Sequence, residues 1–365
     1  MANTFKTFMN SDIANARTLL HEAIPITGSI VSGTYTADAN IKTFAAGMFE
    51  AVYDYPYLSS SANHIFDITV GYSTGSAFSS SANVQNAKKV NIYNQHSQVL
   101  VGYDVGGGLR EFDLDGNITA GGAKMDSCIF LNFSRLLTKD EIKKGSVNLQ
   151  LFTSATFGGA GAHAGINKGN RGANPVTIQD FDGATNYKVN SPAGEYGLLA
   201  SSSVANSPEG TNSPVGHVYY QAGIVVLTSS IFSGAWGYPE STVNPPSIDA
   251  PGYTAAITGS TITELADGFR FTVNNLEFNN TTELNSTIYF CRANTQDYNY
   301  SSNPTYLTAS KIRVKNDNPK AEPVSYLTTV GLYSADNELL AVAKLSEPLK
   351  KTPSNELTLR VRLDY

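Results

Sequence analysis

The chain of 365 residues is poor in charge, in cysteine and in long apolar segments. Charged residues make up only 15% of it, against the roughly 25% that is usual for soluble domains. The 25 Lys and Arg are outnumbered by 31 Asp and Glu, which argues against nucleic-acid binding, since that function requires a basic excess or stripe. No apolar run approaches the roughly eighteen residues needed to span a bilayer, so no membrane insertion is expected.

The two cysteines, Cys128 and Cys291, each stand inside an apolar, strand-like run, SCIFLNF and TIYFCRA. This context predicts buried free thiols and favours a reducing compartment of synthesis. The opening MANTFKTFMNSD lacks the apolar core of a signal peptide. We therefore expect synthesis in a cytoplasm.

Ser, Thr, Asn and Gly take the place of the missing charges, and the chain has 20 Tyr. A polar, weakly charged surface suits a protein that buries much of itself against partners, because desolvating hydroxyls and amides costs less than desolvating charges. The alternative interpretation is an ordinary globular protein that is rich in Asn and Ser.

The last forty residues follow a period of two. Leu357, Leu359, Val361 and Leu363 fall on one face of the final run, and Arg360 and Arg362 fall on the other. Alternation of this kind is typical of a half-buried strand. Together with 327–333 and 338–345, it predicts a three-stranded antiparallel meander, which contains no candidate nucleophile, base or metal cluster.

Short elements are expected along the rest of the chain. Amphipathic spacing predicts helices over 11–23 and 41–53, and Thr138 with Glu141 has the spacing of a capping box that opens one helical turn. Strands are predicted, in chain order, at 64–72, 88–93, 98–103, 109–112, 125–133, 147–152, 217–230, 269–273, 288–290 and 311–314.

The fold class expected from these elements is mainly β, with antiparallel β-sandwich-like domains and a few short helices in the N-terminal half. Gly, Ser and Asn dominate an insertion at 154–215. The Pro-rich stretch 239–252 is interpreted as a linker. It divides a β-rich domain of residues 1–238 from an all-β domain of residues 253–365.

Few residues suggest chemistry. The run from Asp113 to Asn117 resembles the opening of a calcium loop, but the twelfth position is Lys124 where a bidentate Glu is needed. A hairpin turn is the preferred interpretation. The five histidines lack zinc-ligand spacing, and neither a phosphate loop nor a Gly-x-Ser-x-Gly elbow occurs. No catalytic, cofactor-binding or metal residue is therefore predicted, although paired carboxylates for glycoside hydrolysis stay open.

Tyrosine clusters are the candidate sites. Tyr53, Tyr55 and Tyr57 stand at every second position of a run that is too aromatic for an ordinary loop. Tyrosine favours interfaces because its ring can be buried while its hydroxyl stays hydrogen-bonded. A corner of the core is the alternative. The further interface candidates are Tyr298, Tyr300, Tyr306, Arg360, Arg362 and the glycine-rich arm at 158–172.

Several stretches together resemble a known family. They are residues 15–35, 44–73, 133–146, 218–232, 298–306 and the ending from 330. The combination is similar to a virion structural protein of T4-like, marine or cyanobacterial contractile-tailed bacteriophages, and it covers most of the chain except 154–215.

The resemblance implies a non-enzymatic structural component of the virion, made in the host cytoplasm. The tail, baseplate or neck is the preferred hypothesis for its place in the particle. The protein would assemble as a symmetric multimer with copies of itself and with other virion proteins, and without a cofactor. The alternatives are a tail-tip protein that binds a receptor or host-surface glycan and, less favoured, a polysaccharide depolymerase.

Overall fold

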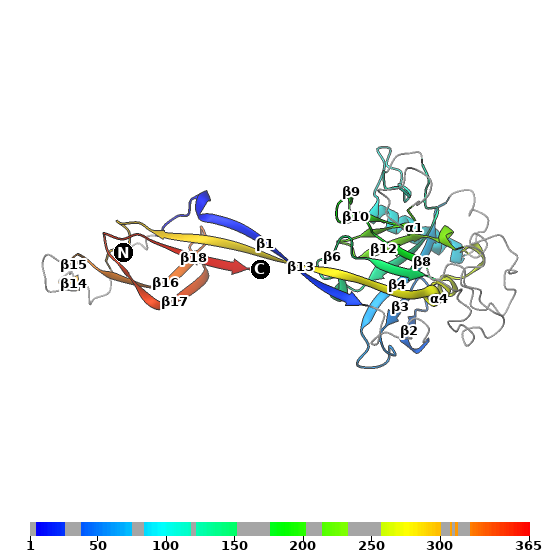
Figure 1. The fold of residues 1–365 in the computed structure, drawn as a ribbon, viewed down its shortest axis with the longest axis horizontal. Coiled ribbons are helices and arrows are strands. Elements are labelled where there is room, and N and C mark those ends of the chain that lie inside the picture. The colour runs from blue at the N-terminus through cyan, green and yellow to red at the C-terminus, as the bar shows by residue number, and fades with distance from the viewer. Residues whose placement is uncertain are drawn as a thin grey trace. The chain divides into compact units, whose positions relative to one another are not determined.

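Two compact units make up the chain (Figure 1). Unit 1 consists of Met1–Leu19 and Glu283–Tyr365, and unit 2 of Leu20–Thr282. The strands β1 (Ile13–Pro25) and β13 (Val273–Ala293) contribute to both. The computed structural model describes residues 5–25, 38–74, 84–117, 122–151, 176–201, 214–232, 257–300, 307–308, 311–312 and 322–365.

Unit 2 is built on an eight-stranded antiparallel sheet of order β2-β3-β4-β5-β12-β11-β10-β9. Its strands are β2 (Ile41–Thr43), β3 (Glu50–Tyr53), β4 (His64–Tyr72), β5 (Ser127–Phe133), β9 (Lys188–Ser191), β10 (Gly194–Leu199), β11 (Gly216–Tyr219) and β12 (Ile224–Thr228). Short 3-10 turns occur at Asn10–Asp12, Asp38–Asn40 and Ser229–Ile231.

A second sheet packs on one face of the first. In it β13 pairs with β6 (Glu141–Ile142) and β7 (Asn148–Leu151), and β7 pairs with β8 (Val176–Gln179). Side chains of both sheets share one apolar cluster, which includes Ile129, Leu131, Leu149 and Phe278. The β-sandwich-like architecture expected from the sequence is confirmed.

Helix α1 (Val84–Leu100) covers the other face of the large sheet. Its Ile92 and Tyr93 pack with Cys128 and Phe130 of β5, while Ile129 and Leu131 point into the sandwich. Strand β5 is thus buried on both faces, which explains its continuous apolar sequence. None of the helices in the described part of the chain is long and apolar enough to cross a membrane.

The strands predicted at 88–93 and 98–103 were wrong, because both lie in or next to α1. The buried side of this helix includes the polar residues Asn86, Lys89 and Ser97. The sequence therefore lacks the regular spacing of apolar residues by which an amphipathic helix is recognised. Lys89 is fully buried, and its ammonium group donates to the backbone oxygens of Ile257, at 2.5 Å, and Ser260. Burial lowers the pKa of Lys89 to about 8.

Two predicted helices are strands instead. Residues 11–23 form much of β1, which pairs with β13, and 41–53 form the hairpin β2–β3 around Gly47, whose φ is +57°. The capping box predicted at Thr138 was also wrong, since this residue ends the short helix α2 (Arg135–Thr138). For residues 11–23, pairing with the distant strand β13 overrides the local pattern.

The helix α4 (Ile262–Thr272) replaces the start of the strand predicted at 269–273. Thr261 and Glu264 form its capping box, with the Glu264 amide donating to Thr261 Oγ1 at 3.2 Å and the Thr261 amide donating to Glu264 Oε2 at 2.7 Å. Its apolar side packs into the core of unit 2, followed at once by β13. The spacing Thr-x-x-Glu was readable in the sequence.

The predicted linker 239–252 lies outside the described residues. The boundaries between the two compact units fall inside β1 and inside β13, so α4 and the first half of β13 belong to unit 2. The predicted insertion is described only at 176–201 and 214–215, where it supplies β8, β9 and β10.

In unit 1, β16 (Ser325–Tyr333) and β17 (Leu339–Lys351) form the predicted antiparallel hairpin. Strand β18 (Leu357–Asp364) does not complete a meander with them, because it pairs along its length with β13, from Ser286 to Ala293. Alternation fixed the faces of β18 but carried no information about its neighbour. Two-residue strands β14 (Leu307–Thr308) and β15 (Lys311–Ile312) complete the described elements.

Asp180 ties three segments of unit 2 together. Its buried carboxylate accepts hydrogen bonds from the Gly145 amide at 2.6 Å, the Val147 amide at 2.9 Å and the Tyr220 hydroxyl at 3.1 Å. Burial raises the pKa of Asp180 to about 6, and these three donors act in the opposite direction. The network holds the turn between β6 and β7 against the start of the loop that follows β8.

We expect Asp180→Asn to lower the free energy of unfolding by about 2 kcal/mol, because the amide group must point its own donors at one of the N–H groups that the carboxylate accepts. Tyr220→Phe removes a single hydrogen bond and is the matched control, expected to cost about 1 kcal/mol. Urea unfolding of both variants measures the difference. Equal effects would show that the two backbone amides do not depend on Asp180.

The buried His217 responds to pH in the opposite sense to Asp180. Burial lowers the pKa of His217 to about 4, below the ordinary 6.5, so the unfolded chain binds this proton more tightly and stability falls as pH drops from 6.5 to 4. The folded pKa of Asp180 lies above the ordinary 3.8. The stabilisation that comes from protonating Asp180 in the folded chain is therefore complete below about pH 4, and it is lost as pH rises through 6.

Two variants separate these contributions. Between pH 6.5 and 4, the stability difference between wild type and Asp180→Asn should grow by about 2 kcal/mol, whereas that between wild type and His217→Asn should shrink by a similar amount. Chemical unfolding at several pH values provides the measurement. A change of the same sign for both variants would contradict these assignments.

Candidate functional site: interaction surfaces

The tyrosines predicted as anchors stand at the surface of unit 2. Tyr53 ends β3 and is half-buried, whereas Tyr55 and Tyr57 in the following turn are 46% and 38% exposed. The ring centroids of Tyr53 and Tyr57 lie 6.4 Å apart, and that of His64 lies 5.4 Å from Tyr53. Since two of the three tyrosines are exposed to solvent, this segment is not a corner of the core.

Hydrogen bonds within the turn and to a residue before β2 hold the segment that carries these rings. The Asp54 carboxylate accepts from the Asn63 amide at 2.6 Å and from the Asn63 side chain at 2.8 Å, and the Tyr57 amide donates to Ala39 O at 3.0 Å. Leu58 at its tip is 85% exposed. A preformed turn loses little conformational entropy on binding, so it suits an aromatic contact surface.

Tyr298 and Tyr300 follow β13 in unit 1 and are 46% and 60% exposed. Their loop is anchored to the β16–β17 hairpin, because Ser325 Oγ donates to Tyr298 O and the buried Lys351 ammonium donates to Asn299 Oδ1 at 2.8 Å. Tyr306 and the arm at 158–172 lie outside the described residues.

Arg360 and Arg362 lie on the exposed face of β18, as the period of two predicts. Arg362 Nε donates to Asp364 Oδ1 at 2.6 Å and to Ser286 Oγ at 3.2 Å. Arg360 lies opposite Phe290 in the register of β13 and β18. The guanidinium group of Arg362 thus has local partners, and recognition of an acidic neighbour by either arginine stays a prediction.

Unit 1 also exposes much apolar surface outside the interface candidates predicted from the sequence. Among the described residues, its only apolar side chains in the buried class are Ala293 and Leu332, and neither belongs to a core cluster. Leu340 and Val342 of β17 are 64% and 51% exposed. The run LLAVA places apolar side chains on both faces of β17, and from this run the exposed apolar surface could have been predicted.

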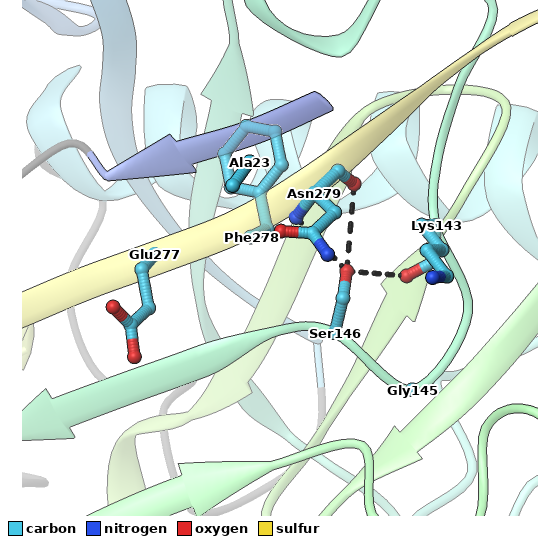
Figure 2. A pocket seen from close by; sticks show the side chains of 7 residues that line it. All are labelled: Ala23, Lys143, Gly145, Ser146, Glu277, Phe278 and Asn279. Carbon is cyan, nitrogen blue, oxygen red and sulfur yellow. Dashed lines mark hydrogen bonds between the residues drawn. The ribbon is translucent and has the colours of Figure 1, made fainter. Parts of the chain in front are cut away.

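A cavity of about 320 Å³ lies in unit 2 between the turn after β6 and strand β13 (Figure 2). The Ser146 hydroxyl at its wall donates to Lys143 O at 2.6 Å and accepts from the Asn279 amide at 3.0 Å. Glu277 accepts from the Asn148 side chain. These groups hold the turn and the strand together, and the serine proton is directed at a backbone carbonyl rather than at a base.

The calcium-loop resemblance at Asp113 has a structural explanation. Lys124, which occupies the position of the missing Glu, places its ammonium group 3.0 Å from the Asp113 carboxylate. Asp113 and Lys124 also form an antiparallel bridge, as expected for the predicted hairpin turn. Within the described ranges, no group of three or more His, Cys, Asp or Glu is arranged to hold a metal ion.

Comparison with protein-family models, with curated proteins and with solved structures finds no match to this chain. The geometry of the two units is therefore the basis for inferring function.

Changing Tyr53, Tyr55 and Tyr57 together to Ala should weaken binding to neighbouring proteins in a reconstituted assembly by at least about tenfold, because exposed aromatic anchors dominate interface energies. Folding stability should fall by no more than about 2 kcal/mol, since two of the rings are exposed. Tyr103→Ala, at a tyrosine 48% exposed elsewhere on unit 2, is the control. Unaltered assembly of the triple variant would remove the anchor assignment.

Proposed function

We propose that this chain is a non-enzymatic structural component of a tailed-bacteriophage virion, located in the tail, baseplate or neck and assembled as a symmetric multimer. The observation that carries the proposal is the large number of exposed apolar side chains in unit 1. Among the described residues of this unit, only two apolar side chains are buried, while fourteen large apolar or aromatic side chains are exposed. A unit of this kind gains its stability from surfaces that other chains cover.

The resemblance to virion structural proteins of T4-like phages supports the same function. In an assembled particle each subunit is surrounded by neighbours, so apolar sheet faces and aromatic turns are buried on assembly rather than on folding. Two buried charged groups of unit 2, Lys89 and Asp180, have structural hydrogen-bond partners and need no chemical role.

A tail-tip glycan binder is the second candidate. Its support is the pair of exposed rings, Tyr55 and Tyr57, on a turn held rigid by Asp54, since exposed aromatic faces suit stacking on sugars. A glycan array probed with the whole chain separates the candidates. Binding that Tyr57→Ala abolishes would favour the receptor function, and a blank array would leave the structural one.

If the proposal is correct, particles of the phage that encodes the chain contain it in a copy number that matches the symmetry of the tail or neck. Quantitative mass spectrometry of purified particles measures the copy number, and a specific antibody locates the protein by electron microscopy. Absence from purified particles, with the protein still produced during infection, would contradict the proposal.

A further inference from the structure

The pairing of β13 with β18 produces one apolar face in unit 1. Residues directly opposite each other in an antiparallel pair point to the same side of the sheet. The register therefore places Tyr289 beside Val361 and Cys291 beside Leu359. Phe290 beside Arg360 and Ile288 beside Arg362 point to the other side, which carries the charged residues of β18.

This apolar face is only partly covered within the chain. Leu357, Leu359, Val361 and Leu363 are all half-buried, in contrast to β5 of unit 2, where Ile129 and Leu131 are completely inaccessible. Phe8 from the N-terminal segment contacts Tyr289, with ring centroids 5.4 Å apart, and covers one part of the face. Thr287 and Ala293 of the same face are buried, and the half-buried side chains leave the rest of it partly open to solvent.

Charge is distributed unequally between the two units. Unit 1 carries 12 Lys and Arg and 10 Asp and Glu, a net charge of +2, whereas unit 2 carries 13 and 21, a net charge of -8. Two copies that meet through unit 1 therefore experience little mutual repulsion, while contact through unit 2 brings together two units that each carry a net charge of -8.

We propose that a second copy of this chain covers the apolar face of β13 and β18, so that unit 1 is the element through which copies associate. The inference rests on the proposed function for the symmetric multimer and adds the surface that forms it. No charged side chain from the paired segments points to this face, as expected for an obligate interface between identical chains, which resembles a core divided in two.

A substitution on each face of β18 tests the assignment. Val361→Lys places an ammonium group in the apolar face and should weaken self-association of the full chain on the order of a hundredfold. Thr358→Lys adds the same charge on the opposite face of the same strand and should leave association unchanged. Sedimentation velocity over a range of concentrations gives the mass of wild type and both variants.

Cys291 provides a second measurement that needs no variant. It is half-buried on the apolar face, while Cys128 is completely buried in unit 2 and becomes reactive only when that unit unfolds. A thiol reagent should therefore modify Cys291 at least about tenfold more slowly in the associated wild type than after dilution to single chains. An unreactive Cys128 shows that unit 2 is folded throughout.

The outcomes separate the two proposals. A chain that stays monomeric at every concentration, with Cys291 reacting at one constant rate, overturns the inference even if the protein is found in virions. An oligomer in which Cys291 stays fully reactive, and which Val361→Lys leaves intact, also overturns it. Association that depends on Val361 supports the inference. If the protein were then absent from purified virions, only the proposed function would be contradicted.

Discussion

An apolar sheet face is stable only when another surface excludes water from it, and the two units of this chain meet that constraint differently. In unit 2 the central strand β5 is covered twice, by α1 on one face and by the second sheet on the other. In unit 1 the strand β18 alternates apolar and polar residues, and none of its apolar residues is buried. Unit 2 therefore has a covered core of its own, whereas for unit 1 we propose that a neighbouring copy covers the apolar face.

The sequence allowed prediction where local pattern and burial agree. Strands β4, β5 and β7 and the hairpin β16–β17 follow from alternation or continuous apolar runs, and so do the exposed positions of Arg360 and Arg362. Helix α1 could not be predicted, because its buried side carries Lys89, whose charge is compensated by backbone oxygens about 170 residues away. The pairing of β18 with β13 also depends on distant parts of the chain.

The same distinction applies to the candidate surfaces. The tyrosine run at 53–57 was visible as a cluster, but only the structure separates a surface turn from a corner of the core. The apolar face of β13 and β18 combines two segments about seventy residues apart, so neither segment alone indicates it. Asp180 with its partners is similar, since the network joins three segments and no single stretch contains it.

The account depends most directly on whether the face of β13 and β18 is covered when copies of the chain meet. Hydrogen exchange of the full chain, followed by mass spectrometry at several protein concentrations, tests this for the backbone of both strands. The account predicts that amides of 286–293 and 357–364 become protected as concentration rises, while those of β5 are protected at every concentration. Exchange in 286–293 and 357–364 that is independent of concentration, with β5 fully protected, would contradict it.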